Sequence, residues 1–266
     1  MKKTFCFVRT FVIAALLAFS FTSCVTTGFN DFYQPWHEPH YFPEDSYLGV
    51  DENPQIIQAS DLNTMFREVS SNWYWCIGYS GFNSSNLEPS EINKALLNLC
   101  KEKGAKIAIY SKVYTDTRNG AYSVPLTDYH YYRTRRGEIR SYTTTSYTTE
   151  YYSVRRYDFS SYLFVSIPDT YKPMYLPGFS LADLTQQDRE RYKQNTGCFI
   201  DIVYKNTPAY YANLLHGDII TRINGTPVYS VADFMEFKKS ASVGDSWIVT
   251  FIRDGVEKQV SLIVGL

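Results

Sequence analysis

The chain has 266 residues, a length that fits two ordinary domains, and 26 basic residues against 27 acidic ones give it a net charge of −1. This balance argues against nucleic acid as a partner, which would favour a basic excess, and there is no acidic tail for a basic partner. The unusual feature is an aromatic content of 17%, to which 24 tyrosines contribute most.

Residues 1–23 have the organisation of a secretion signal. Lys2 and Lys3 precede an apolar run at 11–19, which is too short for a membrane span. The sequence Phe21-Thr-Ser-Cys24 resembles a bacterial lipobox, which implies cleavage before Cys24 and lipid attachment to this residue. A diacylglycerol and an amide-linked chain together would provide more than one acyl anchor. The alternative is plain secretion, with Cys24 as an ordinary thiol.

Lipidation would place the protein in a bacterial cell envelope, tethered to a membrane. Val25 follows the cysteine, and the absence of Asp there resembles outer-membrane sorting, so we expect the outer rather than the inner membrane. Prolines interrupt residues 24–54, which predicts a flexible tether. His37, Glu38 and His40 fall within it, but a zinc site needs a further ligand and the other histidines are distant in sequence, so we expect no metal and no cofactor.

Residues 55–171 predict an α/β domain. Asp61 caps an apolar helix, and the strand at 73–79 is followed by a helix from Pro89 to Gly104 and by a strand at 106–114. Strand, helix and strand with short connections form a βαβ unit, so these two strands should be parallel.

A tract rich in Tyr, Thr and Arg follows at 128–157 and predicts a long, exposed hairpin, because it contains few aliphatic residues to bury. Its tyrosines could form a binding surface for sugars or peptides. The alternative, which we favour, is that aromatic pairs across the strands stabilise the ribbon itself.

Three cysteines, Cys76, Cys100 and Cys198, remain beyond the signal and Cys24, and an odd number does not predict a disulfide framework. We expect buried free thiols, with a Cys76–Cys100 bridge as the alternative.

Residues 206–228 contain the most specific pattern of the chain. Thr207 and Pro208 begin a short helix, Gly217 ends it, an apolar strand follows at 219–223, and Asn224-Gly225 forms a tight turn. This succession resembles the PDZ domain of HtrA/Deg-type bacterial proteases. The resemblance implies that residues 172–266 form a PDZ domain, a sandwich or partly open barrel with two helices. With the segments Gly78–Phe82 and Arg156–Asp158, the whole chain resembles uncharacterised PDZ-containing envelope lipoproteins, which implies no activity.

The PDZ resemblance also implies peptide binding by strand addition at the edge that follows Gly178. The family's carboxylate-binding loop aligns with Tyr175-Leu-Pro-Gly-Phe179, although Pro177 lacks an N–H there. The expected peptide-binding residues are Leu176, Gly178, Phe179, Leu181, Phe234 and Met235.

Catalysis is the rival interpretation. Ser80 lies in a Gly-Tyr-Ser-Gly sequence that lacks the second glycine of a nucleophile elbow, and neither His130 nor His216 stands in a recognisable catalytic context. We therefore expect a non-catalytic, lipid-anchored adaptor that binds the C-termini or extended segments of other envelope proteins. The alternatives are a structural envelope protein with an unused or self-occupied PDZ groove and, less favoured, a PDZ-linked serine hydrolase.

Overall fold

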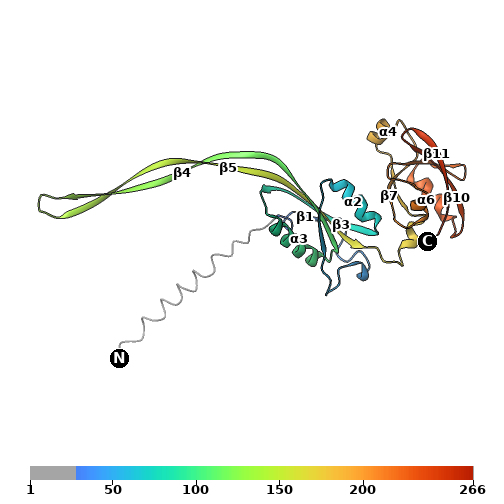
Figure 1. Ribbon diagram of the computed structural model, residues 1–266, viewed down its shortest axis with the longest axis horizontal. Coiled ribbons are helices and arrows are strands. Elements are labelled where there is room, and N and C mark those ends of the chain that lie inside the picture. The colour runs from blue at the N-terminus through green and yellow to red at the C-terminus, as the bar shows by residue number, and fades with distance from the viewer. Residues whose placement is uncertain (1–27, 266) are drawn as a thin grey trace, which may run out of the picture.

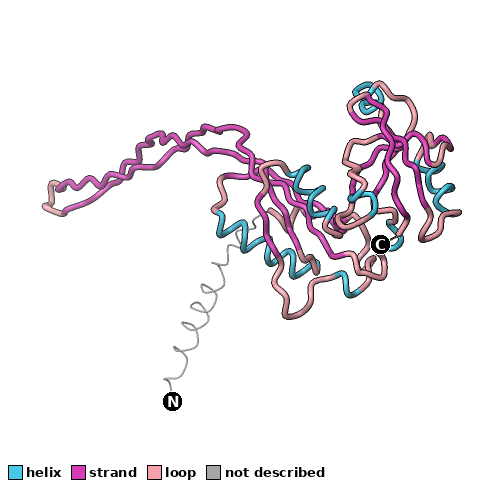
Figure 2. The backbone as a smooth tube through the Cα atoms, turned by 45° about the vertical axis from the view of Figure 1, so that its right-hand side comes forward, coloured by secondary structure: helices cyan, strands magenta, loops and turns pink. Residues whose placement is uncertain are grey.

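A computed structural model describes residues 28–265, which form two β-sheets and one long β-ribbon (Figures 1 and 2). The predicted signal and the predicted lipidation site at Cys24 lie outside the described residues. Within 28–265, no helix combines the length and the apolar character needed to cross a membrane.

The first sheet has five strands in the order β1-β3-β5-β4-β2. These are β1 (Tyr33–Pro35), β2 (Gln55–Gln58), β3 (Tyr74–Ser85), β4 (Ile107–Arg133) and β5 (Ile139–Ser166). Because β5 is antiparallel to both β3 and β4, those two strands run parallel, as the βαβ pattern predicts. They do not pair with each other, since the ribbon returns β5 into the space between them.

Two helices cover opposite faces of this sheet. α3 (Pro89–Lys103) packs its apolar stripe against a cluster that includes Ala108 and Tyr110 of β4, whereas α2 (Leu62–Ser71) packs against Ile107 and Ile109. The two sets alternate along β4, as expected for a strand buried on both faces.

Residues 28–54 are packed on the first sheet, so the predicted flexible tether is wrong for this part of the chain. β1 pairs with β3, Phe29 is fully buried, and Phe42 stacks on Trp75 with ring centroids 4.6 Å apart. A short 3₁₀ helix, η1 (Glu44–Ser46), completes the segment. The prolines that suggested a tether are accompanied by aromatic side chains, and burial of these side chains outweighs the irregular backbone.

Beyond the sheet, β4 and β5 continue as a two-stranded ribbon that projects far from the rest of the molecule (Figure 1). Its tyrosines are largely exposed, and some stack across the strands, as His130 does on Tyr142 at 4.8 Å. The predicted exposed hairpin is therefore confirmed.

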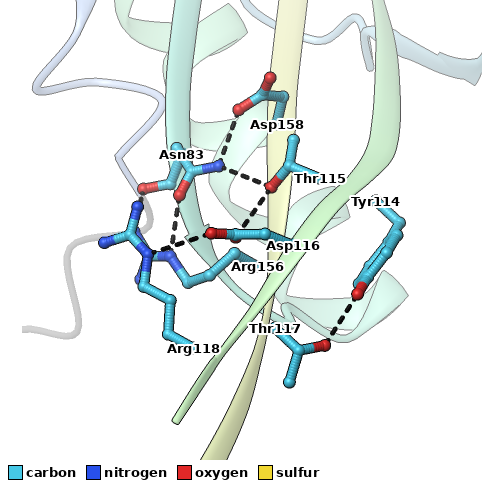
Figure 3. Close-up of polar contacts among 8 residues, drawn as sticks. All are labelled: Asn83, Tyr114, Thr115, Asp116, Thr117, Arg118, Arg156 and Asp158. Atoms are coloured by element: carbon cyan, nitrogen blue, oxygen red, sulfur yellow. Dashed lines mark hydrogen bonds and ion pairs between the residues drawn. The ribbon is translucent and has the colours of Figure 1, made fainter. Parts of the chain in front are cut away.

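A polar cluster holds the ribbon at the point where it leaves the sheet (Figure 3). The Asn83 amide donates to Thr115 at 3.2 Å and to Asp158 at 2.8 Å, and Arg156 donates to the side-chain and backbone oxygens of Asn83 at 2.8 Å each. The strand register shifts between Tyr114 and Asp116, so these bonds surround a β-bulge. Bulges bend a strand, and this cluster fixes the ribbon at such a bend.

The second sheet has the order β11-β10-β8-β7-β6, with β9 paired to β8. Its strands are β6 (Phe179–Asp183), β7 (Cys198–Val203), β8 (Ile219–Ile223), β9 (Thr226–Pro227), β10 (Ser246–Arg253) and β11 (Val256–Ile263). The accompanying helices are η2 (Lys172–Tyr175), α4 (Gln186–Tyr192), α5 (Pro208–Tyr211) and α6 (Val231–Lys239). The helix at Pro208, its Thr207 cap and the final hairpin confirm the predicted pattern. α4 was not predicted, because its sequence is polar throughout.

Candidate functional site

β6 occupies one margin of the second sheet. Its only partner within residues 28–265 is β7, so its other edge is unpaired. α6 lies beside β6 and runs in the opposite direction, since Asp183 at the end of β6 accepts a hydrogen bond from the N–H of Val231, the first residue of α6, at 2.8 Å. At the other end, Lys238 donates to the carbonyl of Met174, just before β6. The helix is thus bonded to the end of β6 and to η2, which precedes β6.

Apolar side chains of the predicted site come together between β6 and α6. Phe179 and Phe234 are 5% and 3% exposed, with ring centroids 5.5 Å apart, and Leu181 packs against the same core. Leu176 belongs to this core as well, whereas Met235 is half exposed on the helix. Phe179, Phe234 and Leu176 are thus core residues, and Leu181 and Met235 are the predicted residues with exposed surface at this site.

The loop before β6 offers few backbone donors. Pro177 has no N–H, and the N–H of Gly178 donates to the carbonyl of Tyr175 at 2.8 Å. Tyr204 donates to the carbonyl of Gly178 at 2.9 Å, so the carbonyl of Gly178 faces the chain that continues β7. The backbone groups of Phe179, which is opposite Val203, then point the other way. The N–H of Phe179 consequently faces the open edge and is the donor that the loop presents there.

Gly178 is required by the packing of this loop. Gly178 has φ +110°, and a Cβ there would approach Thr207 Oγ1 to 2.1 Å. Glycine is needed because the loop packs directly on Thr207, the N-cap of α5. Gly178 therefore acts on the site by allowing this close packing.

A buried ion pair links the start of β8 to the end of β10 in the same sheet. Asp218 accepts hydrogen bonds from Arg253 Nε at 2.7 Å and from Arg253 Nη2 at 2.6 Å, and its side chain is 1% exposed. The N–H of Leu215 donates to the same carboxylate at 2.8 Å. The hydrogen bonds of Arg253 to Asp218 and the charges of Asp218 and Asp254 raise the pKa of Arg253 above its ordinary value. Asp218 therefore joins the loop after α5 to the start of β8 and the end of β10.

The two sheets meet at an aromatic junction. Trp73 stacks on Tyr204 with centroids 4.5 Å apart and donates through its indole N–H to the Lys205 carbonyl at 3.0 Å, while Trp75 donates to the Tyr175 hydroxyl at 2.7 Å. A cavity of about 780 Å³ opens beside this junction, and Met174 and Tyr175 of η2 line it. η2 therefore contacts both the junction and the loop that precedes β6.

The residues considered for catalysis are not brought together. Ser80 is fully buried and donates to the Phe29 carbonyl at 2.7 Å, His130 bonds to Thr144 on the ribbon, and His216 Nδ1 lies 2.8 Å from the Asp201 carbonyl. Cys76, Cys100 and Cys198 are free thiols, as preferred from their number, and burial raises the pKa of each to about 12. No group of three or more metal-ligating side chains occurs among residues 28–265.

In a comparison with protein families, residues 178–264 match the sequence model of the PDZ domain. A search of curated proteins found no match. Among solved structures, the HtrA3 PDZ domain bound to a phage-derived ligand (FGRWV) is similar, with 19% identity, a TM-score of 0.30, and coverage of 33% of this chain and 82% of that one.

The HtrA-type protease AlgW is also similar. Its complex with a decapeptide is 19% identical with a TM-score of 0.32 over 40% of this chain, and its complex with a tripeptide is 20% identical with a TM-score of 0.31 over 39%. This chain covers only 37% and 39% of those two chains.

Proposed function

We propose, from the premise that residues 178–264 are a PDZ domain, that this protein binds the C-termini or extended segments of other proteins by strand addition. The observation that carries the proposal is the unpaired edge of β6, which lies beside α6 at the margin of the sheet. A peptide added at this edge would bond to backbone groups such as the N–H of Phe179, and its side chains would contact Leu181 and Met235.

An array of immobilised peptides with free C-termini, varied at the last four positions, tests this proposal with the purified protein. We expect binding that favours an apolar last residue. Met235→Arg should weaken it roughly tenfold, about 1.4 kcal/mol, because a charge would face the apolar side chain of the peptide. Val243→Arg is the matched control, since Val243 is 78% exposed in the turn after α6. An array without any bound peptide would contradict the proposal.

The biological role that we propose is a non-catalytic adaptor in a bacterial envelope, held at a membrane by lipid on Cys24. The arrangement around Ser80 supports a role without catalysis, because its hydroxyl is buried and bonded to a backbone carbonyl. The alternative of a self-occupied groove receives no support from residues 28–265, since no strand of this range pairs with the outer edge of β6.

Labelling of cells with a radioactive fatty acid tests the anchor. We expect incorporation into the protein and its loss in Cys24→Ala. Cys6→Ala is the control, because residue 6 would be removed with the signal. Equal labelling of the wild type and Cys24→Ala would disprove the anchor and leave peptide binding untouched.

A further inference from the structure

Lys238 is a partly buried cation without an acidic partner. Its ammonium donates to the carbonyl of Met174, and within residues 28–265 no carboxylate oxygen lies within 4.0 Å of it. The neighbouring Lys239, in contrast, is exposed and pairs with Glu236 at 2.6 Å. Burial lowers the pKa of Lys238, as expected where solvation is lost without compensation by an anion. Buried cations are usually paired, so this position favours an anionic ligand.

The location of Lys238 indicates which part of a ligand would supply that anion. Lys238 lies one helical turn after Phe234, on the same face of α6, and Phe234 contacts Phe179 at the start of β6. The contact with Met174 places the Lys238 ammonium beside the residues that precede β6. A strand that pairs with β6 and ends at the start of β6 would therefore have its last residue near Lys238.

The adjacent loop cannot bind an anion well by itself. Pro177 has no N–H, the N–H of Gly178 is already donated to Tyr175, and Phe179 supplies the one donor directed at the edge. A carboxylate at this place would need a further partner, because an ion that loses water without compensating bonds is unfavourable.

We propose that Lys238 binds the carboxylate at the end of the captured peptide and replaces the backbone donors that Pro177 and Gly178 do not provide. This inference rests on the proposed peptide binding. The ammonium would form a charge-assisted hydrogen bond with the carboxylate, while the N–H of Phe179 donates a second bond. A free N-terminus at the same place would bring two cations together, so Lys238 also sets the direction in which a peptide binds. The carboxylate is the α-carboxylate of the last residue or its acidic side chain.

Fluorescence anisotropy with matched peptides tests the inference. The peptide that binds best on the array is prepared with a free C-terminus, with a C-terminal amide, and as an amide with Asp as its last residue. Wild type should bind the free acid about tenfold more tightly than the amide. Lys238→Gln, which keeps an N–H donor for Met174, should bind the acid about tenfold more weakly and the amide as before. Lys239→Gln is the control and should change neither affinity.

The outcomes separate this inference from the proposed function. If Lys238→Gln keeps the wild-type ratio of acid to amide affinity, Lys238 does not bind the carboxylate, although peptide binding stands. Tight binding of the Asp amide that is lost in Lys238→Gln supports the inference and identifies the side chain as the source of the carboxylate. If wild type binds none of the peptides, the proposed function is wrong and this inference with it.

Discussion

Within residues 28–265, the edge of β6 and the edges of the ribbon are both unpaired backbone, but they differ in length and surroundings. β6 has five residues, and apolar residues of the sheet and of α6 lie beside it. β4 and β5 have 27 and 28 residues, and their outer halves carry polar and aromatic side chains that face solvent on both sides. Long exposed edges invite pairing with other chains, whereas a short edge next to a helix admits one peptide.

The two edges also differ in how far their positions depend on contacts with the rest of the molecule. The position of β6 relies on the Gly178 contact with Thr207, on the two bonds to α6 and on the Asp218–Arg253 pair. The ribbon relies on the polar cluster at its base and on pairing between its own strands. Changes to the framework of β6 should therefore be costly, and changes to the ribbon should not.

The largest effect is expected from the Asp218–Arg253 pair. Asp218→Ala leaves Arg253 without its buried partner and the N–H of Leu215 without its acceptor, so the free energy of unfolding of the C-terminal region should fall by about 3–5 kcal/mol. Urea unfolding followed by tryptophan fluorescence measures it, since Trp247 is buried in this core. Glu257→Ala is the control, because its pair with Arg222 is exposed and should contribute less than about 1 kcal/mol. Equal losses of unfolding free energy in Asp218→Ala and Glu257→Ala would show that burial of the Asp218–Arg253 pair is unimportant.

The next effect is expected at Gly178. Gly178→Ala combines a positive φ with a Cβ that approaches Thr207, and should destabilise the C-terminal region by about 2–4 kcal/mol. Gly255→Ala has φ +77° with no atom within 4 Å of the added Cβ, so it should cost about 1 kcal/mol for the backbone alone. Similar midpoints for the two variants in urea would contradict the tight packing of the loop.

The sequence was sufficient to predict most of the C-terminal fold. Caps and the Asn-Gly and Asp-Gly turns are local signals, and the chain around Thr207 and Asn224 follows them. The predicted end of the helix at Gly217 is wrong, because α5 already ends at Tyr211 with Ala212 as its C-cap. The apolar segments at 73–79 and 106–114 likewise predicted two strands of the first sheet, and the Tyr- and Thr-rich composition of 128–157 predicted the exposed ribbon.

The contents of the site were harder to predict, because they depend on contacts between distant residues. The sequence cannot show that the N–H of Gly178 is bonded to Tyr175 or that Gly178 packs on Thr207. It also gave no reason to select Lys238, which on a helical wheel is an ordinary lysine in a last turn. The aromatic packing of residues 28–54 was missed for the same reason, since Phe42 finds Trp75 only in the folded chain.

A smaller loss of stability is expected at the aromatic junction between the two sheets. Tyr175→Phe removes the acceptor of the Trp75 indole N–H and should destabilise the protein by about 1 kcal/mol. Tyr171→Phe makes the same change beside the same tryptophan, where the Tyr171 hydroxyl has no hydrogen bond within residues 28–265, and should be neutral. Hydrogen exchange of the Trp75 indole measures the difference. Unchanged exchange in Tyr175→Phe would mean that the bond is not held in solution.

The smallest effect on stability is expected from removal of most of the ribbon, although this changes more residues than any of the substitutions. At the ribbon tip the N–H of Thr134 donates to the carbonyl of Glu138 at 2.8 Å. The register is regular from there to Arg118 and Val154, so the backbone groups of these two residues also face each other. Removal of 121–153 leaves Asn119-Gly120 between these two residues, a sequence suited to a two-residue turn.

This shortened chain keeps the polar cluster around Asn83 and Arg156, both helices of the first sheet and the whole second sheet. The free energy of unfolding should stay within about 1 kcal/mol of the wild-type value, because the deleted residues bury little surface against the rest of the molecule. Affinity for the array peptides should also be unchanged, since the ribbon projects away from the second sheet, which contains β6 (Figure 1). Urea unfolding and the peptide array measure the two quantities. A large loss of stability would mean that the ribbon supports the sheet, and a loss of peptide binding would mean that both unpaired edges belong to one binding surface.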